Sequence, residues 1–260
     1  MKTLLTRSDL VAQIAALGVN SGDRLLVHTR MSSLGYVPGS QQAVIEALIQ
    51  AVGETGTIVM PTYSGDLSDP AEWRYPPVPE EWIERIRDEM PAYDPQKTPT
   101  RRMGSIPEYF RHVPGAVRSD HPQSSFTALG PDAARIVGGH CLDMRFGPES
   151  PLARLYDLGG KTLLLGSPFD TNSMLYLTEH RVPWKVTVSK RAPIMSDGKK
   201  IWKDYADLAY TCDWFDDVAL YLIEQGIAHR GTVGDAACYV FPIRESVEAA
   251  VQWRIDRHSK

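Results

Sequence analysis

The spacing of apolar residues changes from helical to strand-like within the first sixty positions. Intervals of three and four residues predict a helix over residues 10–17, which we expect Ser8 to cap. Short apolar runs at 25–27 and 57–60 predict two buried strands, and residues 43–52 have helical spacing between them. Strand, helix and strand in this order form a βαβ unit, which predicts a parallel or mixed sheet.

The same two patterns continue through the second half of the chain. We expect helices over 106–110, 133–137, 215–223 and 247–253, strands over 125–129, 162–165 and 233–241, and a hairpin that pairs 186–190 with 199–204. We also expect Asp170 to cap a helix that runs through Tyr176 to Glu179. These elements predict a single α/β domain over residues 1–260, with a mixed or mostly parallel central sheet and helices on both faces.

Residues 64–104 differ from the rest because they are rich in proline and aromatic residues. One helix is expected inside this insertion, over residues 80–89. An insertion of this length is either a functional lid or a packed surface excursion, and its composition does not decide between them.

Composition narrows the class of protein. The chain has 260 residues, of which 43% are hydrophobic and 23% charged, as in ordinary globular proteins. Its formal net charge of −4 argues against a dedicated nucleic-acid binder. Cys141, Cys212 and Cys238 form no CxxC pair, which favours free thiols in a reducing compartment. With neither a secretory signal pattern nor an apolar run of about 20 residues, we expect a cytoplasmic protein without membrane or metal partners.

Four segments could carry chemistry. His28 ends a predicted strand, where ligands gather in open α/β sheets, although a lone histidine is more often structural. The small turn 32–35 could hold an oxygen-rich ligand on its backbone N–H groups, or it is an ordinary connection. Residues 118–122 combine an arginine, hydroxyl and carboxyl groups and a histidine, which suit either phosphate binding or a solvated loop. Tyr176, Glu179 and His180 lie within one turn, as a general-base cluster or as surface polar residues.

These segments together resemble one family, the aminoglycoside 3-N-acetyltransferases, also called the antibiotic N-acetyltransferase family. The resemblance covers nearly the whole chain, and the segments that carry it in order are 25–35, 56–64, 118–130, 146–153, 163–179 and 231–236. It implies the fold of that family. It also implies transfer of an acetyl group from acetyl-CoA to the 3-amino group of the 2-deoxystreptamine ring of aminoglycoside antibiotics, in a monomer or homodimer.

The resemblance also implies two binding regions. The expected acetyl-CoA contacts are Thr29, Arg30, Ser32, Ser33, Leu34, Gly35, Arg118, Ser119, Ser125 and Phe126. A polycationic acceptor calls for a pocket lined by carboxylates. The expected acceptor contacts are Tyr63, Asp66, Glu149, Asp170 and Asp213.

One position departs from the family pattern. Three residues before Glu179 the family carries a histidine, the expected general base, and this chain has Tyr176. A phenol, with a reference pKa near ~10, is a poor base at neutral pH. Three interpretations stay open: activity is lost, His28 moves the proton instead, or His180 does. The alternatives to aminoglycoside acetylation are therefore acetylation of another amine, or binding of coenzyme or drug without turnover.

Overall fold

The predicted βαβ unit lies at the centre of the structure. A computed structural model describes residues 2–258 of the chain. In it β1 (Arg24–Thr29) pairs in parallel with β2 (Thr57–Pro61), and α2 (Ser40–Val52) connects them. The strand over 162–165 is β5 (Lys161–Leu165), which pairs in parallel with β1 on its other side. The three parallel strands were therefore correctly predicted as the buried centre of the sheet.

Antiparallel strands extend this centre on both sides. They are β3 (Val117–Arg118), β4 (Phe126–Leu129), β8 (His229–Val233) and β9 (Ala236–Pro242), and the sheet order is β3-β4-β2-β1-β5-β9-β8. The mixed sheet is confirmed. The strand expected over 233–241 corresponds to β9, but the chain reverses after Val233, so that β8, which we did not predict, forms a hairpin with β9.

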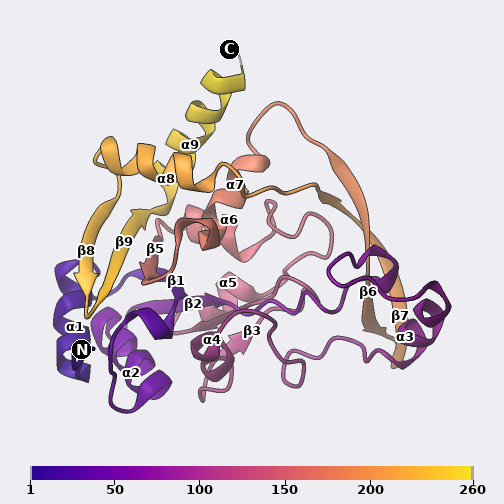
Figure 1. Cartoon of the computed structure of the whole chain (residues 1–260), viewed down its shortest axis with the longest axis horizontal. Coiled ribbons are helices and arrows are strands. Elements are labelled where there is room, and N and C mark those ends of the chain that lie inside the picture. The colour runs from indigo at the N-terminus through magenta and orange to yellow at the C-terminus, as the bar shows by residue number, and fades with distance from the viewer. Residues whose placement is uncertain (1, 259–260) are drawn as a thin grey trace.

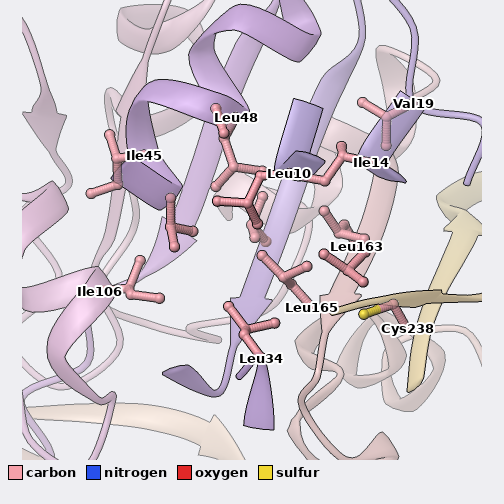
Figure 2. Packing of buried hydrophobic residues seen from close by; sticks show 14 of the residues in the cluster. Leu10, Ile14, Val19, Leu34, Ile45, Leu48, Ile106, Leu163, Leu165 and Cys238 are labelled. Carbon is pink, nitrogen blue, oxygen red and sulfur yellow. The ribbon is translucent and has the colours of Figure 1, made fainter. Parts of the chain in front are cut away.

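Helices cover both faces of the sheet, as predicted. One face carries α1 (Arg7–Ala16), α2 and α4 (Ser105–Phe110). The other carries α5 (Ala133–Val137), α6 (Pro151–Asp157), α7 (Tyr176–Glu179), α8 (Phe215–Glu224) and α9 (Ile243–His258). Side chains alternate along β1 and β5, so that Leu163 and Leu165 join the first core, shown in Figure 2, and Leu164 joins the second. Helix α1 begins at Arg7, earlier than expected, because Thr6 rather than Ser8 caps it, in a reciprocal pair with Asp9.

The insertion packs against the predicted hairpin, at one side of the sheet (Figure 1). The insertion contains η2 (Pro70–Glu72), η3 (Glu80–Trp82) and α3 (Ile83–Glu89), and the hairpin consists of β6 (Thr187–Ser196) and β7 (Lys199–Leu208). Residues 199–204 pair with 191–196, so the expected pairing with 186–190 was wrong. The indole of Trp202 on β7 donates a 3.0 Å hydrogen bond to the carbonyl of Arg87. Arg87 in turn binds both carboxylate oxygens of the buried Asp69, at 2.7 and 2.8 Å. The insertion is therefore an ordered wall of the molecule.

We predict that Leu164→Ala destabilises the fold by about 2–5 kcal/mol, because Leu164 is fully buried in the second core at the sheet centre. Leu220→Ala is the matched control, since Leu220 is 52% exposed, and we expect it to change stability by less than about 0.5 kcal/mol. Urea unfolding of the three proteins measures both values. Equal losses for the two variants would contradict the assignment of Leu164 to the core.

Candidate active site

The carboxyl ends of β1 and β5 form a switch point of the sheet, which we call the crevice between β1 and β5. The chain leaves β1 toward α2 on one face of the sheet and leaves β5 toward α7 on the other. Neighbouring parallel strands whose connections diverge in this way form the usual ligand crevice of open α/β sheets. The N–H of Arg30 bonds to the carbonyl of Leu165 at 3.1 Å, which fixes the two exits side by side.

The loop after β1 forms a tight turn, η1 (Met31–Ser33), across this crevice. The N–H groups of Ser33 and Leu34 bond back to Arg30 and Met31 at 3.1 and 3.3 Å. Neither of these bonds uses the N–H groups of Met31 and Ser32, which come earlier in the turn. Within residues 2–258, Met31 and Ser32 are therefore the two positions of this turn whose amides stay free for a ligand. Ser32 was among the expected amides, whereas those of Ser33 and Leu34, also expected, are used within the turn.

Gly166 allows the turn to approach β5. A Cβ atom at Gly166 would lie 2.1 Å from the hydroxyl oxygen of Ser33, and the backbone has φ 69°. The Ser33 hydroxyl is within hydrogen-bond distance of the carbonyls of Arg30 (2.7 Å) and Gly166 (3.1 Å). The predicted coenzyme loop is thus held against the end of β5 by contacts that only glycine permits.

His28 connects β1 to the segment that follows β5. Its side chain is 6% exposed, and burial lowers its pKa to about 3. Its Nε2 accepts the backbone N–H of Ser173 at 3.3 Å, so the proton of the neutral ring is on Nδ1. An imidazole with an occupied lone pair and such a low pKa is a positioning group, which disfavours the interpretation that His28 moves the proton.

The segment after β5 is not the single capped helix that we predicted. It forms three short turns: η4 (Phe169–Thr171), η5 (Ser173–Leu175) and α7. Asp170 lies exposed in the first turn and caps nothing. Asn172 between the turns is fully buried, and its side-chain amide has no hydrogen-bond partner in the described chain. A buried orphan amide beside a predicted ligand crevice is a signal that sequence reasoning missed.

Tyr176 lies in a cluster of aromatic rings. It stacks on Phe146 with centroids 4.6 Å apart and planes at 7°, and it meets Tyr210 and Phe215 at 5.4 and 5.1 Å. Burial raises the pKa of Tyr176 above its ordinary value. No hydrogen bond holds its hydroxyl among residues 2–258. Tyr176 is therefore a neutral phenol that can donate a hydrogen bond but does not accept a proton at neutral pH.

Glu179 has other partners than Tyr176, whereas His180 shares Tyr210 with it. The carboxylate of Glu179 lies 2.7 Å from Nη1 of Arg254 on α9 and accepts a 3.2 Å bond from the indole of Trp214. His180 Nε2 lies 2.6 Å from the hydroxyl of Tyr210, and burial lowers the His180 pKa to about 4. The predicted cluster of three side chains is thus divided among three environments. The interpretation that His180 moves the proton is also disfavoured.

A cleft of about 2060 Å³ opens between the insertion, the hairpin and the second face of the sheet. Among the predicted acceptor residues, Tyr63 and Asp66 line it, and so does Tyr176. Tyr63 donates a 2.8 Å hydrogen bond to the hydroxyl of Ser173, the residue whose N–H reaches His28. Tyr63 therefore connects the cleft to the crevice between β1 and β5.

Several other predicted site residues lie away from this cleft. Glu149, Asp170 and Asp213 do not line it, and neither do Arg118, Ser119, Ser125 and Phe126. The guanidinium of Arg118 is buried, and its donors bind the oxygens of Thr62, Ser64, Pro95, Thr98 and Ser125 at 2.5–3.3 Å. Arg118 therefore ties the insertion to β2 and β4 and has no donor left for a phosphate.

Two further histidines line the cleft with both ring nitrogens engaged. His140 donates from Nε2 to the Arg145 carbonyl at 2.7 Å, so its Nδ1 accepts from the Ser119 hydroxyl at 3.0 Å. His121 donates from Nε2 to the Leu142 carbonyl, and its Nδ1 accepts backbone N–H groups. Burial lowers both pKa values, that of His140 to about 4. Neither imidazole is free to act as a base.

The comparisons with known proteins agree with this fold and crevice. The family model described as aminoglycoside 3-N-acetyltransferase matches residues 26–254. The chain belongs to the aminoglycoside 3-N-acetyltransferase family, and its fold is that of these acetyltransferases. The family prediction made from the sequence is confirmed.

Individual relatives match over nearly their full length. The SPbeta prophage-derived aminoglycoside N(3′)-acetyltransferase-like protein YokD of Bacillus subtilis is 43% identical over 256 residues, which are 98% of this chain and 94% of YokD. The crystal structure of YokD superposes with a TM-score of 0.96 at 42% identity, over 100% of this chain and 95% of that one. The solved structure of AAC-IIIb in a binary complex with CoASH gives a TM-score of 0.87 at 31% identity, over 98% of both chains.

Two negative observations concern residues 2–258 alone. No helix in this range is long and apolar enough to cross a membrane. The same range contains no group of three or more histidine, cysteine or acidic side chains placed to share a metal ion.

We predict that Gly166→Ala destabilises the fold by about 1–3 kcal/mol more than Gly159→Ala does. Both glycines have positive φ, 69° and 64°, but only Gly166 has neighbours within 4 Å of the new Cβ atom. The difference between the two stability losses therefore separates the effect of the close approach of Ser33 from the backbone strain that both variants share. Thermal unfolding measures the difference, and equal losses would show that the turn does not depend on this contact.

Proposed function

We propose that this chain transfers the acetyl group of acetyl-CoA to an amine, with the 3-amino group of the 2-deoxystreptamine ring of aminoglycosides as the first acceptor to test. One observation carries the proposal. In a chain of this family, Tyr63 and Tyr176 lie on the cleft wall, and Tyr63 is joined through Ser173 to His28 at the crevice between β1 and β5. The enzyme names of the relatives, and the coenzyme A in the solved complex of AAC-IIIb, support both substrates.

The crevice suits the coenzyme. In this proposal the free N–H groups of Met31 and Ser32 face the thioester end of acetyl-CoA, and the hydroxyl of Ser33 and Gly166 hold the turn in place. Thr29 and Arg30 continue the same loop, and Leu34 is its buried anchor. This arrangement concentrates the coenzyme contacts in residues 29–35 and leaves Arg118, Ser119, Ser125 and Phe126 to support the cleft from behind.

The reaction itself needs a neutral amine and donors for the oxygen of the thioester. The amine nitrogen attacks the thioester carbon, the C–N bond forms and the C–S bond breaks. The sulfur leaves as coenzyme A thiolate, and the nitrogen loses its extra proton to solvent. Tyr176, as a neutral phenol on the cleft wall, donates to the developing oxyanion or to the departing sulfur. His28 and Glu179 position the surrounding segments without exchanging protons with the amine.

A second candidate function is coenzyme or drug binding with little turnover. One observation favours it: His28, His121, His140 and His180 each have a ring nitrogen engaged by a hydrogen bond within the protein. General-base catalysis contributes about 10²–10⁴-fold to such reactions. A site without a free base would therefore be slower than one with an imidazole in place of Tyr176.

The test of the proposed function is release of free thiol from acetyl-CoA in the presence of apramycin, gentamicin, kanamycin or neomycin. We expect coenzyme binding by calorimetry, and turnover that rises with pH, because the reactive fraction of the amine rises until the amine is fully deprotonated. A protein that binds no acetyl-CoA and no coenzyme A would contradict the proposal. Binding without turnover on any of these drugs would select the second candidate.

We predict that Tyr176→His raises kcat/KM at pH 7 by about tenfold or more, because an imidazole titrates near ~6.5 and can accept the proton of the amine. The gain should disappear below that pKa, where the imidazole is already protonated. Tyr176→Phe is the matched control, since it keeps the ring that stacks on Phe146 and removes only the hydroxyl. A Tyr176→His variant that binds coenzyme but gains no rate would refute the missing-base explanation.

A further inference from the structure

The cleft wall carries more basic than acidic side chains. Six arginine or lysine and four acidic residues line the cleft, although the chain as a whole carries −4. Four of the cations have a carboxylate partner within 4.0 Å: Lys97 with Asp94, Arg101 with Asp66, Lys190 with Glu72, and Arg145 with Asp207. Within the described chain this leaves Arg74, Arg102 and Asp120 on the wall without an ion pair.

Arg102 has a conformation that its own contacts do not explain. Its backbone has φ 59°, in the left-handed region that costs a residue with a Cβ atom about 1 kcal/mol or more. Its side chain is exposed on the cleft wall and makes no hydrogen bond or ion pair with residues 2–258. An unfavourable backbone that presents an unpartnered guanidinium to a cleft is typical of a ligand contact.

The backbone of Arg101 joins residues 101–102 to Tyr63 in the site. Its N–H bonds to the carbonyl of Tyr63 at 2.7 Å, so residues 101–102 follow directly beside the end of β2. Arg101 pairs with Asp66 at 3.1 Å, but the two side chains are 56% and 64% exposed. Such an exposed pair is worth only about 0–1 kcal/mol and exchanges readily for another anion.

We propose that Arg101 and Arg102 form an anion-binding element of the cleft, which takes a phosphate or carboxylate group of a substrate of the acetyl transfer. Two adjacent guanidinium groups bind such a group through paired N–H donors. Two substrates can supply it: the phosphates of the coenzyme, or an anionic group that the acceptor carries in addition to its amine. This proposal rests on the proposed function only in naming the coenzyme and the acceptor as the two molecules that carry the anionic group.

The experiment measures binding of two probes by calorimetry. Adenosine 3′,5′-bisphosphate represents the phosphate end of the coenzyme. The pair 2-aminoethyl phosphate and 2-aminoethanol represents an acceptor with and without an anionic group. The proteins are the wild type, Arg102→Gln, and Arg74→Gln as the matched control, because Arg74 lines the same cleft and loses the same charge.

We expect Arg102→Gln to weaken the binding of at least one phosphate probe by about tenfold, which is the loss of one charge-assisted contact. Arg74→Gln should change it less than about threefold. Loss for the bisphosphate identifies the coenzyme as carrier, and loss for 2-aminoethyl phosphate identifies the acceptor. The proposal is overturned if the wild type binds neither probe at about 10 mM, or if the two variants behave alike.

Arg102→Gly separates a binding role from a structural one. Glycine adopts positive φ without strain, so we expect the Tm of this variant to equal or exceed that of the wild type while the phosphate probes bind as weakly as to Arg102→Gln. A lower Tm with unchanged binding would overturn the proposal. Because these readouts do not use acetyl transfer, their failure and the failure of the proposed function are distinguishable.

Discussion

The parallel pairing of β1 with β5 is the constraint on which the rest of the site depends. Five residue pairs, from Leu25 with Lys161 to Thr29 with Leu165, align the two strands so that they end together. Their connections then run to opposite faces of the sheet, which opens the crevice between them. The contact of Ser33 with Gly166 is possible only because both strands stop at the same level. The hydrogen bond from Ser173 to His28 fixes the second exit in the same way.

The aromatic cluster around Tyr176 forms part of the cleft wall. Burial lowers the pKa values of the histidines near the site, and each ring is held by at least one hydrogen bond within the protein. These imidazoles therefore stay neutral through the physiological pH range and serve as fixed connectors between loops. In the proposed reaction, proton transfer relies on the substrate amine and on solvent, while the phenol of Tyr176 contributes as a donor. The surroundings of Tyr176 thus suit a neutral phenol at the position where the family has an imidazole.

Local patterns in the sequence were sufficient for the central sheet and most helices. Runs such as 162–165 are apolar on both faces, as a strand buried on both sides must be, and the Ser196-Asp197-Gly198 turn marked the hairpin. The segment 169–179 was harder, because its three short turns follow from the bond of Ser173 to His28, a residue 145 positions away. The burial of Arg118 among backbone carbonyls could not be predicted from the sequence either, since an arginine in a polar loop is usually exposed. Long-range contacts of this kind decide which predicted site residues meet.

Three of the acceptor carboxylates expected from the sequence, Glu149, Asp170 and Asp213, do not line the cleft. Charge along a sequence does not show which cation each carboxylate will pair with. Asp66 is occupied by Arg101, Glu72 by Lys190 and Asp94 by Lys97, so the acidic side chains of the cleft neutralise its own basic ones. Among the described residues, a polycation finds Asp120 unpaired on this wall and would have to displace the partners of the other three carboxylates, whereas an anion meets Arg102 without displacing any partner. Electrostatic selection in this cleft therefore depends on unpaired charge rather than on the number of charged residues, and Arg102 is where that unpaired charge lies beside the site.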